Sequence, residues 1–275
     1  MIALSEFSCP VDAGVVLRGV QSRGTDGDPL ILLHGYSDSW RSYLPLMREL
    51  PPSMRLVAFS QRGHGDSSKP TAAYGTEVMA RDVARAMDQL GIARAVVVGH
   101  SMGSLVAQRL AQDHADRVSR LVLIGAFASL KGNVGAEALW RDAISTMSDP
   151  VPPSFAREFQ SSCLARPVPD EFLSEVVAES LKLPAHVWRS ALAAVLSEDR
   201  SHLLGRIAAP TTIIWGDRDA FCGKAEQERL ARSIPDARLV VYEGTGHAPH
   251  WEEPARAAAD LVATVSASAT PRAAA

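Results

Sequence analysis

One serine lies where its hydroxyl could act as a nucleophile. Ser101 is the centre of a G-x-S-x-G pattern with Gly99 and Gly103, directly after the β-branched run Ala95–Val98 and just before a helical stretch, Ser104–Asp113. A tight turn between a strand and a helix exposes the serine hydroxyl, and only small residues fit two positions before and after it. The N–H groups at the start of the helix favour a developing oxyanion. This context predicts a nucleophile, whereas the bare pattern also occurs by chance in Gly-rich loops.

A serine nucleophile requires a histidine base and a carboxylate that orients the imidazole. In an architecture of this kind the acid and then the histidine follow the nucleophile along the chain. Asp219 follows the apolar run Thr211–Trp215, and His247 follows the run Arg238–Tyr242. Both therefore come after predicted strands, and open parallel sheets place their active sites at the carboxyl ends of strands. We predict Asp219 as the acid and His247 as the base.

Two neighbouring residues are alternatives to this acid and this base. Asp217 precedes Asp219 by two positions, but the G-x-x-D spacing from Gly216 favours Asp219, and Asp217 is expected to cap the turn. His250 follows His247 by three positions, but it lacks the preceding glycine turn that lets a histidine reach over the strand ends.

Five motifs occur in the order typical of one superfamily: LLHGY at 32–36, RGHGDS at 62–67, GHSMG at 99–103, WGDRD at 215–219 and GH at 246–247. In these motifs, and over nearly its whole length, the chain resembles the α/β-hydrolase fold superfamily, in the branch of serine esterases, lactonases and carbon–carbon bond hydrolases. The resemblance implies that Ser101, Asp219 and His247 form the triad. It also implies that the backbone N–H groups of Tyr36 and Met102 form the oxyanion hole.

The chain departs from this family at one loop. The loop before Arg62 usually begins with aspartate, where this chain has Ser60 and Gln61. That aspartate is not the triad acid in such enzymes, so the departure puts a structural hydrogen bond in question. Some relatives carry the acid one strand earlier, but the stretch Ala126–Ser129 contains no carboxylate.

The alternation of predicted elements indicates an α/β fold with a mainly parallel, doubly wound sheet. The strand signal disappears from about residue 131 to 201, where four helices separated by Pro-rich breaks are predicted. We expect residues 1–130 and 202–265 to form the core, 131–201 an inserted helical cap, and the Ala/Ser-rich residues 266–275 a disordered tail. A cap closes one side of a pocket, so its large apolar residues are candidate substrate contacts: Trp140, Phe155, Phe159 and Trp188.

Composition limits the function classes. The 275 residues are 47% hydrophobic and 21% charged, with a net charge of −3 and no basic stripe, so no nucleic-acid partner is expected. The absence of H-E-x-x-H and C-x-x-C patterns argues against a metal site, and we expect no cofactor. Three scattered cysteines, Cys9, Cys163 and Cys222, are expected to be free thiols in a reducing compartment. With no evident signal peptide or spanning segment, the sequence favours a cytoplasmic location and no membrane partner.

These observations predict a serine hydrolase that cleaves a neutral, fairly bulky carboxylic ester or lactone through an acyl-enzyme. Carbon–carbon bond hydrolases and perhydrolases use the same triad and remain alternatives. A ligand receptor with low turnover on the same fold is an alternative from another class. The expected partner is the small-molecule substrate, and the choice between a monomer and a homodimer stays open.

Overall fold

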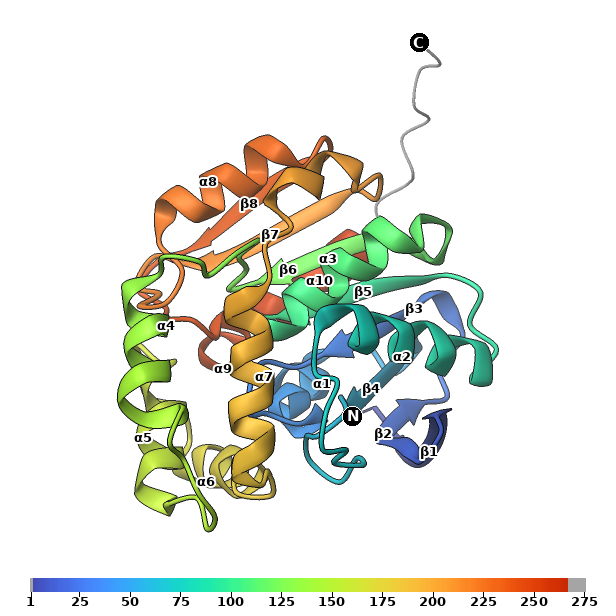
Figure 1. The fold of residues 1–275 in the computed structure, drawn as a ribbon. Helices are drawn as coiled ribbons and strands as arrows, with labels where there is room; N and C mark the ends of the chain where they lie inside the picture. The colour runs from blue at the N-terminus through green and yellow to red at the C-terminus, as the bar shows by residue number, and fades with distance from the viewer. Residues whose placement is uncertain (1, 267–275) are drawn as a thin grey trace.

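The computed structural model describes residues 2–266. Within these residues an eight-stranded sheet lies between helices, and a further group of helices lies to one side of it (Figure 1). The strands are β1 (Leu4–Asp12), β2 (Val15–Ser22), β3 (Asp26–Leu33), β4 (Met54–Ser60), β5 (Ala95–His100), β6 (Val118–Ile124), β7 (Thr211–Gly216) and β8 (Ala237–Tyr242). The helices flanking the sheet are α1 (Leu44–Glu49), α2 (Thr76–Gln89), α3 (Met102–Asp113), α8 (Lys224–Ser233), α9 (Pro249–Glu252) and α10 (Pro254–Ser266).

The strand order is β1-β2-β4-β3-β5-β6-β7-β8. Strand β2 pairs antiparallel with β1 and β4, and all the remaining neighbours are parallel. The predicted α/β class with a mainly parallel sheet is confirmed. Strand β1 was not predicted, because it is a half-exposed edge strand whose polar residues interrupt the apolar pattern.

The core lies on both faces of the sheet, because successive side chains of a strand point to opposite faces. In β5, Val97 packs in the cluster that contains Leu105 of α3. The next residue, Val98, packs in the cluster that contains Leu261 of α10. Coverage on both sides explains why the central strands are continuous apolar runs in the sequence.

Between β6 and β7 the chain forms the helices α4 (Val134–Leu139), α5 (Pro153–Ser162), α6 (Asp170–Ser180) and α7 (Ala185–Ser197), which we call the inserted helices. A π-helical turn, η3 (Trp140–Ile144), extends α4. Figure 1 shows the inserted helices together beyond the carboxyl ends of the parallel strands. Short 3₁₀ turns occur at η1 (Trp40–Tyr43), η2 (Ala115–Arg117) and η4 (Ser201–Arg206).

The sequence predicted a tail at residues 266–275 and showed no evident membrane-spanning segment. Ser266 is the last residue of α10, and the remainder of the expected tail, 267–275, lies outside the described residues. Among residues 2–266, no helix combines the length and apolarity needed to cross a membrane.

Candidate active site

Ser101 occupies a strained turn between β5 and α3. Its φ of 50° and ψ of −118° lie in a region that non-glycine residues rarely adopt. The turn is tight enough that a Cβ on Gly99 would lie 2.3 Å from the Gly103 carbonyl oxygen, and a Cβ on Gly103 would lie 2.2 Å from the Leu33 carbonyl oxygen. The two glycines of the motif are therefore required by backbone contacts. The Ser101 N–H donates to the Ile124 carbonyl oxygen at 3.0 Å, which holds the turn against β6.

Asp219 and His247 meet beyond the ends of β7 and β8. The His247 Nδ1–H donates to Asp219 Oδ2 at 2.8 Å. Asp219 Oδ1 accepts hydrogen bonds from the N–H groups of Phe221 at 2.8 Å and Cys222 at 2.9 Å. Burial alone would raise the pKa of Asp219, but the charge of His247 and these hydrogen bonds outweigh it and hold the pKa below its usual value. Asp219 is therefore a carboxylate that fixes the His247 ring.

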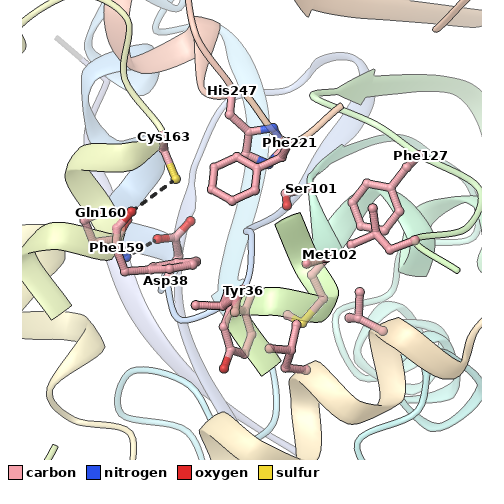
Figure 2. A pocket seen from close by; sticks show the side chains of 15 residues that line it. Tyr36, Asp38, Ser101, Met102, Phe127, Phe159, Gln160, Cys163, Phe221 and His247 are labelled. Carbon is pink, nitrogen blue, oxygen red and sulfur yellow. Dashed lines mark hydrogen bonds between the residues drawn. The ribbon is translucent and has the colours of Figure 1, made fainter. Parts of the chain in front are cut away.

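Ser101 and His247 line the same cavity, with the imidazole of His247 on one side of the serine hydroxyl (Figure 2). With Nδ1 donating to Asp219, Nε2 is the nitrogen of His247 that can accept a proton. The loop of His247 is held from two sides: its N–H donates to the Cys163 carbonyl oxygen at 2.8 Å, and His100 Nε2–H donates to its carbonyl oxygen at 3.1 Å. The base is therefore tied to both the sheet and the inserted helices.

The loop after β3 is held by His34. His34 Nδ1–H donates to the Gly35 carbonyl oxygen at 2.8 Å, and its Nε2 accepts from the Gln61 N–H at 2.8 Å. Burial lowers the pKa of His34 well below its usual value, which keeps the ring neutral as these two bonds require. The Gly35 carbonyl belongs to the same peptide group as the N–H of Tyr36, so His34 orients that N–H. The Gln61 side chain donates a further bond to the His34 carbonyl oxygen at 2.9 Å, so the residue that departs from the family pattern supports this loop.

The next loop is fixed by a buried ion pair. Arg62 donates two hydrogen bonds to the Asp82 carboxylate, at 2.6 and 2.8 Å. Beside it, the His64 Nδ1–H donates to the Arg62 carbonyl oxygen at 2.8 Å, and burial lowers the pKa of His64 to about 4. These contacts are structural.

Asp217 and His250, the alternatives to the predicted acid and base, have other surroundings. Asp217 Oδ1 accepts from the Gly244 N–H at 2.6 Å, so this carboxylate joins the turn after β7 to the turn after β8, in keeping with the expected cap. His250 is fully buried and packs between Tyr43 and His100, at ring-centroid distances of 5.0 and 4.6 Å.

Asp219, Cys222 and His247 have potential metal-ligating atoms within 4.8 Å of one another, the one such group among residues 2–266. However, both Asp219 oxygens already accept hydrogen bonds, one of them from His247 itself. Burial also raises the pKa of the Cys222 thiol well above its usual value, whereas a metal ligand must be a thiolate. These three residues therefore fit a hydrogen-bonded acid and base better than a metal site. All three cysteines are buried and unbridged.

The cavity above Ser101 is small and mostly apolar, with a volume of about 50 Å³. The loops after the strands and the inserted helices both contribute to its lining, which consists of Tyr36, Asp38, Ser101, Met102, Phe127, Leu130, Ala136, Leu139, Phe159, Gln160, Cys163, Leu192, Val195, Phe221 and His247.

Of the four expected substrate contacts in the inserted helices, Phe159 lines the cavity. Trp140, Phe155 and Trp188 lie outside the lining, and their contact with substrate stays a prediction. Trp188 is fully buried behind it, with its ring edge-on to Phe155 and Phe159 at centroid distances of 5.6 and 5.7 Å. Its carbonyl oxygen also accepts a 2.7 Å hydrogen bond from the Tyr36 hydroxyl. These side chains support the cavity wall and do not form its surface.

Sequence reasoning missed Asp38 and Gln160, two polar residues of the lining. Gln160 Nε2 donates to Asp38 Oδ1 at 2.9 Å, although the two residues are 122 positions apart. The available signals were a carboxylate in the loop four residues after His34, and a glutamine four residues after Ala156 on the buried side of α5. Neither signal indicates that the two residues meet.

Comparisons with known proteins identify the family of this chain. The model of a family described as alpha/beta hydrolase fold matches residues 28–169 and 176–254, and the chain belongs to this family. The pimeloyl-[acyl-carrier protein] methyl ester esterase of Neisseria meningitidis serogroup B is 30% identical over 227 residues, which cover 79% of this chain and 85% of the esterase.

Two solved structures are also similar. The esterase EaEST from Exiguobacterium antarcticum has a TM-score of 0.86 at 23% identity and covers 96% of this chain and 100% of its own, a likeness of fold. Est816, described as an N-acyl homoserine lactone degrading enzyme, has a TM-score of 0.81 at 25% identity, covering 94% of this chain and 100% of its own.

Proposed function

We propose that this protein is a serine hydrolase that cleaves a neutral carboxylic ester or lactone through an acyl-enzyme. The observation that carries the proposal is the 2.8 Å hydrogen bond between His247 and the buried Asp219, beside the strained turn that presents Ser101 to the same cavity. A histidine held by a carboxylate and lining the same cavity as a serine is an arrangement that can activate the serine hydroxyl group.

In the proposed mechanism Ser101 Oγ attacks the carbonyl carbon of the substrate while His247 Nε2 takes its proton. The N–H groups of Tyr36 and Met102 donate to the oxyanion that forms. Collapse of this intermediate breaks the bond to the leaving oxygen, which receives the proton from His247. Water then attacks the acyl-enzyme by the same route, and Ser101 recovers its proton. Asp219 stabilises the imidazolium at both stages.

The inserted helices act in this proposal as a cap, with residues 131–201 closing the site on a core of residues 1–130 and 202–265. Supporting it, α4 contributes Leu139 to the cavity, α5 contributes Phe159, and α7 contributes Leu192 and Val195. These apolar side chains favour an uncharged acyl or alcohol group. Because the cavity is only about 50 Å³, a bulky substrate extends to the mouth or requires the cap to move.

The relatives support the reaction class. The enzyme of Neisseria meningitidis is named as a methyl ester esterase, and Est816 as a lactone-degrading enzyme. Both named substrates contain a carboxylic ester group, which fits the proposed role of Ser101.

The test is steady-state hydrolysis of a panel of p-nitrophenyl esters from acetate to decanoate together with a set of lactones. Wild-type protein is expected to turn over members of the panel, with kcat/KM rising several-fold per methylene, at roughly 0.8 kcal/mol for each buried CH₂, until the cavity is filled. Ser101→Ala is expected to lower kcat by about 10⁶-fold. Mass spectrometry of protein treated with a fluorophosphonate is expected to place the label on Ser101.

Retention of more than a few per cent of activity in Ser101→Ala would contradict the acyl-enzyme mechanism. Lack of turnover of every ester and lactone, with tight binding of a small ligand, would instead indicate a receptor. Cleavage of a carbon–carbon bond in a diketone, or peracid formation from hydrogen peroxide, would place the same triad in one of the two related reaction classes.

A further inference from the structure

The cavity above Ser101 has different chemistry on its two sides. Asp38, Gln160 and Cys163 lie on one side of Ser101, and Phe127 lies on the opposite side (Figure 2). Among the residues of the lining, Asp38 is the one carboxylate, since Asp219 lies behind His247. This polar side has no part in the proposed acyl transfer, so its chemistry requires another explanation.

The Asp38 carboxylate is buried with unused hydrogen-bonding capacity. Its side chain is 3% exposed. Gln160 Nε2–H donates to its Oδ1 at 2.9 Å, whereas a carboxylate has about four acceptor positions. The ion pairs of residues 2–266 include none between Asp38 and a lysine or arginine. A buried acceptor that lacks donors costs free energy, so buried carboxylates normally collect them.

His100 does not supply the missing donor. Its Nδ1 lies 3.8 Å from Asp38 Oδ2, beyond hydrogen-bonding distance. Its Nε2–H already donates to the His247 carbonyl oxygen at 3.1 Å. Burial lowers the pKa of His100, and in the neutral ring Nδ1 is an acceptor. At this distance His100 does not occupy Asp38 Oδ2, which can accept a hydrogen bond from a group in the cavity.

The position of Asp38 is nevertheless well defined. The amide of Gln160 also donates toward Ser180 Oγ at 2.8 Å and Ser37 Oγ at 3.2 Å, so it joins α5, α6 and the loop after β3 at one point. A Cβ on Gly35 would lie 3.0 Å from Asp38 Oδ2, so glycine at this position lets the carboxylate approach the loop closely. Asp38 is thus held, on the cavity wall, two residues after the proposed oxyanion donor Tyr36.

From this arrangement we infer that Asp38 is a specificity-determining residue that accepts a hydrogen bond from a hydroxyl group of the substrate, so that the preferred substrates are hydroxy-substituted esters. The inference rests on the proposed function, because it concerns the same cavity. A hydroxyl fits better than an ammonium group, which carries three donors and loses its hydration in a cavity whose other wall is apolar. A site that hydrogen-bonds a substrate hydroxyl discriminates strongly against the analogue that lacks it, because its own polar group is then left unpaired.

The experiment compares kcat/KM for matched esters. One pair places the hydroxyl on the acyl group, ethyl 3-hydroxybutyrate against ethyl butyrate. The other places it on the alcohol, 2-hydroxyethyl butyrate against propyl butyrate. Wild-type protein is expected to prefer the hydroxylated ester of one pair by at least about tenfold, as a hydrogen bond to a charged group provides. Ethyl 3-aminobutyrate is included as the cationic analogue.

The variants test whether Asp38 is the cause. Asp38→Leu is expected to bring the hydroxy-to-deoxy ratio close to one, and Asp38→Asn, which keeps one acceptor oxygen, to retain part of the preference. Phe127→Leu, on the opposite wall, is the matched control and is expected to change both members of a pair by the same factor. General damage to the fold would likewise lower both rates together and leave the ratio unaltered.

Binding provides a readout that does not depend on turnover. In titration calorimetry with Ser101→Ala protein, the hydroxy ester is expected to bind at least about tenfold more tightly than its deoxy partner. A wild-type ratio near one in both pairs, an Asp38→Leu variant that keeps the preference, or a stronger preference for the amino ester would overturn the inference. If wild-type protein hydrolyses the hydroxy ester and its deoxy partner with equal kcat/KM, the inference fails and the proposed function stands. If Ser101→Ala protein binds the hydroxy ester selectively but wild-type protein hydrolyses no ester, the proposed function fails and the inference about Asp38 stands.

Discussion

His247 donates from Nδ1 to Asp219 Oδ2 at 2.8 Å, and the other oxygen of the same carboxylate accepts two backbone N–H groups. These three hydrogen bonds therefore hold the Asp219 carboxylate with Oδ2 toward the imidazole of His247. The two residues come from the turns after β7 and β8, which are adjacent and parallel. This relationship separates Asp219 from its neighbour Asp217 in a way that kinetics can test.

Asp219→Asn is expected to lower kcat by about 10⁴-fold, because an amide in this place no longer fixes the imidazole with its acceptor nitrogen toward the serine. Asp217→Asn is the matched control. It weakens the 2.6 Å bond from the Gly244 N–H, so it is expected to cost about 1 kcal/mol of stability and little activity. Initial rates and denaturant unfolding of both variants check this, and the opposite ranking of rates would assign the acid to Asp217.

Gly103→Ala is expected to lower the free energy of unfolding by more than about 3 kcal/mol. The added Cβ would lie 2.2 Å from the Leu33 backbone carbonyl oxygen, and moving the sheet to relieve this clash would itself cost free energy. Gly205→Ala, where an added Cβ has no atom within 4 Å, is expected to stay within about 1 kcal/mol of wild type. The free energy of unfolding in urea measures both. Similar values for the two variants would show that the turn at Ser101 is looser than described.

Stability is expected to fall as the pH decreases below about 6.5. Burial lowers the pKa of His34, His64 and His250, so the unfolded chain binds protons at these positions that the folded chain does not. For His64 the loss extends from the unfolded value of about 6.5 down to about 4, at about 1.4 kcal/mol per pH unit. Denaturant unfolding between pH 7.5 and 5 measures the slope.

His64→Asn is expected to reduce this slope by the contribution of one histidine, about 2 kcal/mol between pH 6.5 and 5. His202→Asn serves as the control, since the side chain of His202 is exposed in the folded protein. An equal effect of the two variants would mean that His64 is charged in the folded state.

Prolonged treatment with a chelator such as EDTA is expected to leave hydrolytic activity unchanged. Asp219, Cys222 and His247 lie close enough to bind a metal, but the Asp219 oxygens are occupied by hydrogen bonds and the thiol of Cys222 is protonated. Activity before and after dialysis against EDTA, followed by addition of zinc or manganese, checks this expectation. A loss restored by either ion would assign a metal to this group.

Much of this protein follows from local sequence. Ser101, Asp219 and His247 could be proposed because each follows a β-branched apolar run, and parallel strands bring their carboxyl ends to one edge of a sheet. The same runs predicted the central strands and the α/β class. Local signals suffice here because the strained turn at Ser101 needs its two glycines within two residues, and strand periodicity is a property of adjacent positions.

The tertiary structure decided which side chains reach the cavity. Trp188 and Phe159 carry the same apolar signal and lie in two of the inserted helices. One is nevertheless buried behind the wall and the other lines the cavity, because the way each helix docks determines which of its side chains reach the cavity. Gln61 supports His34, and Gln160 meets Asp38, across 27 and 122 residues. Such pairings depend on how elements far apart in the sequence dock, and no pattern of neighbouring residues indicates which of them will meet.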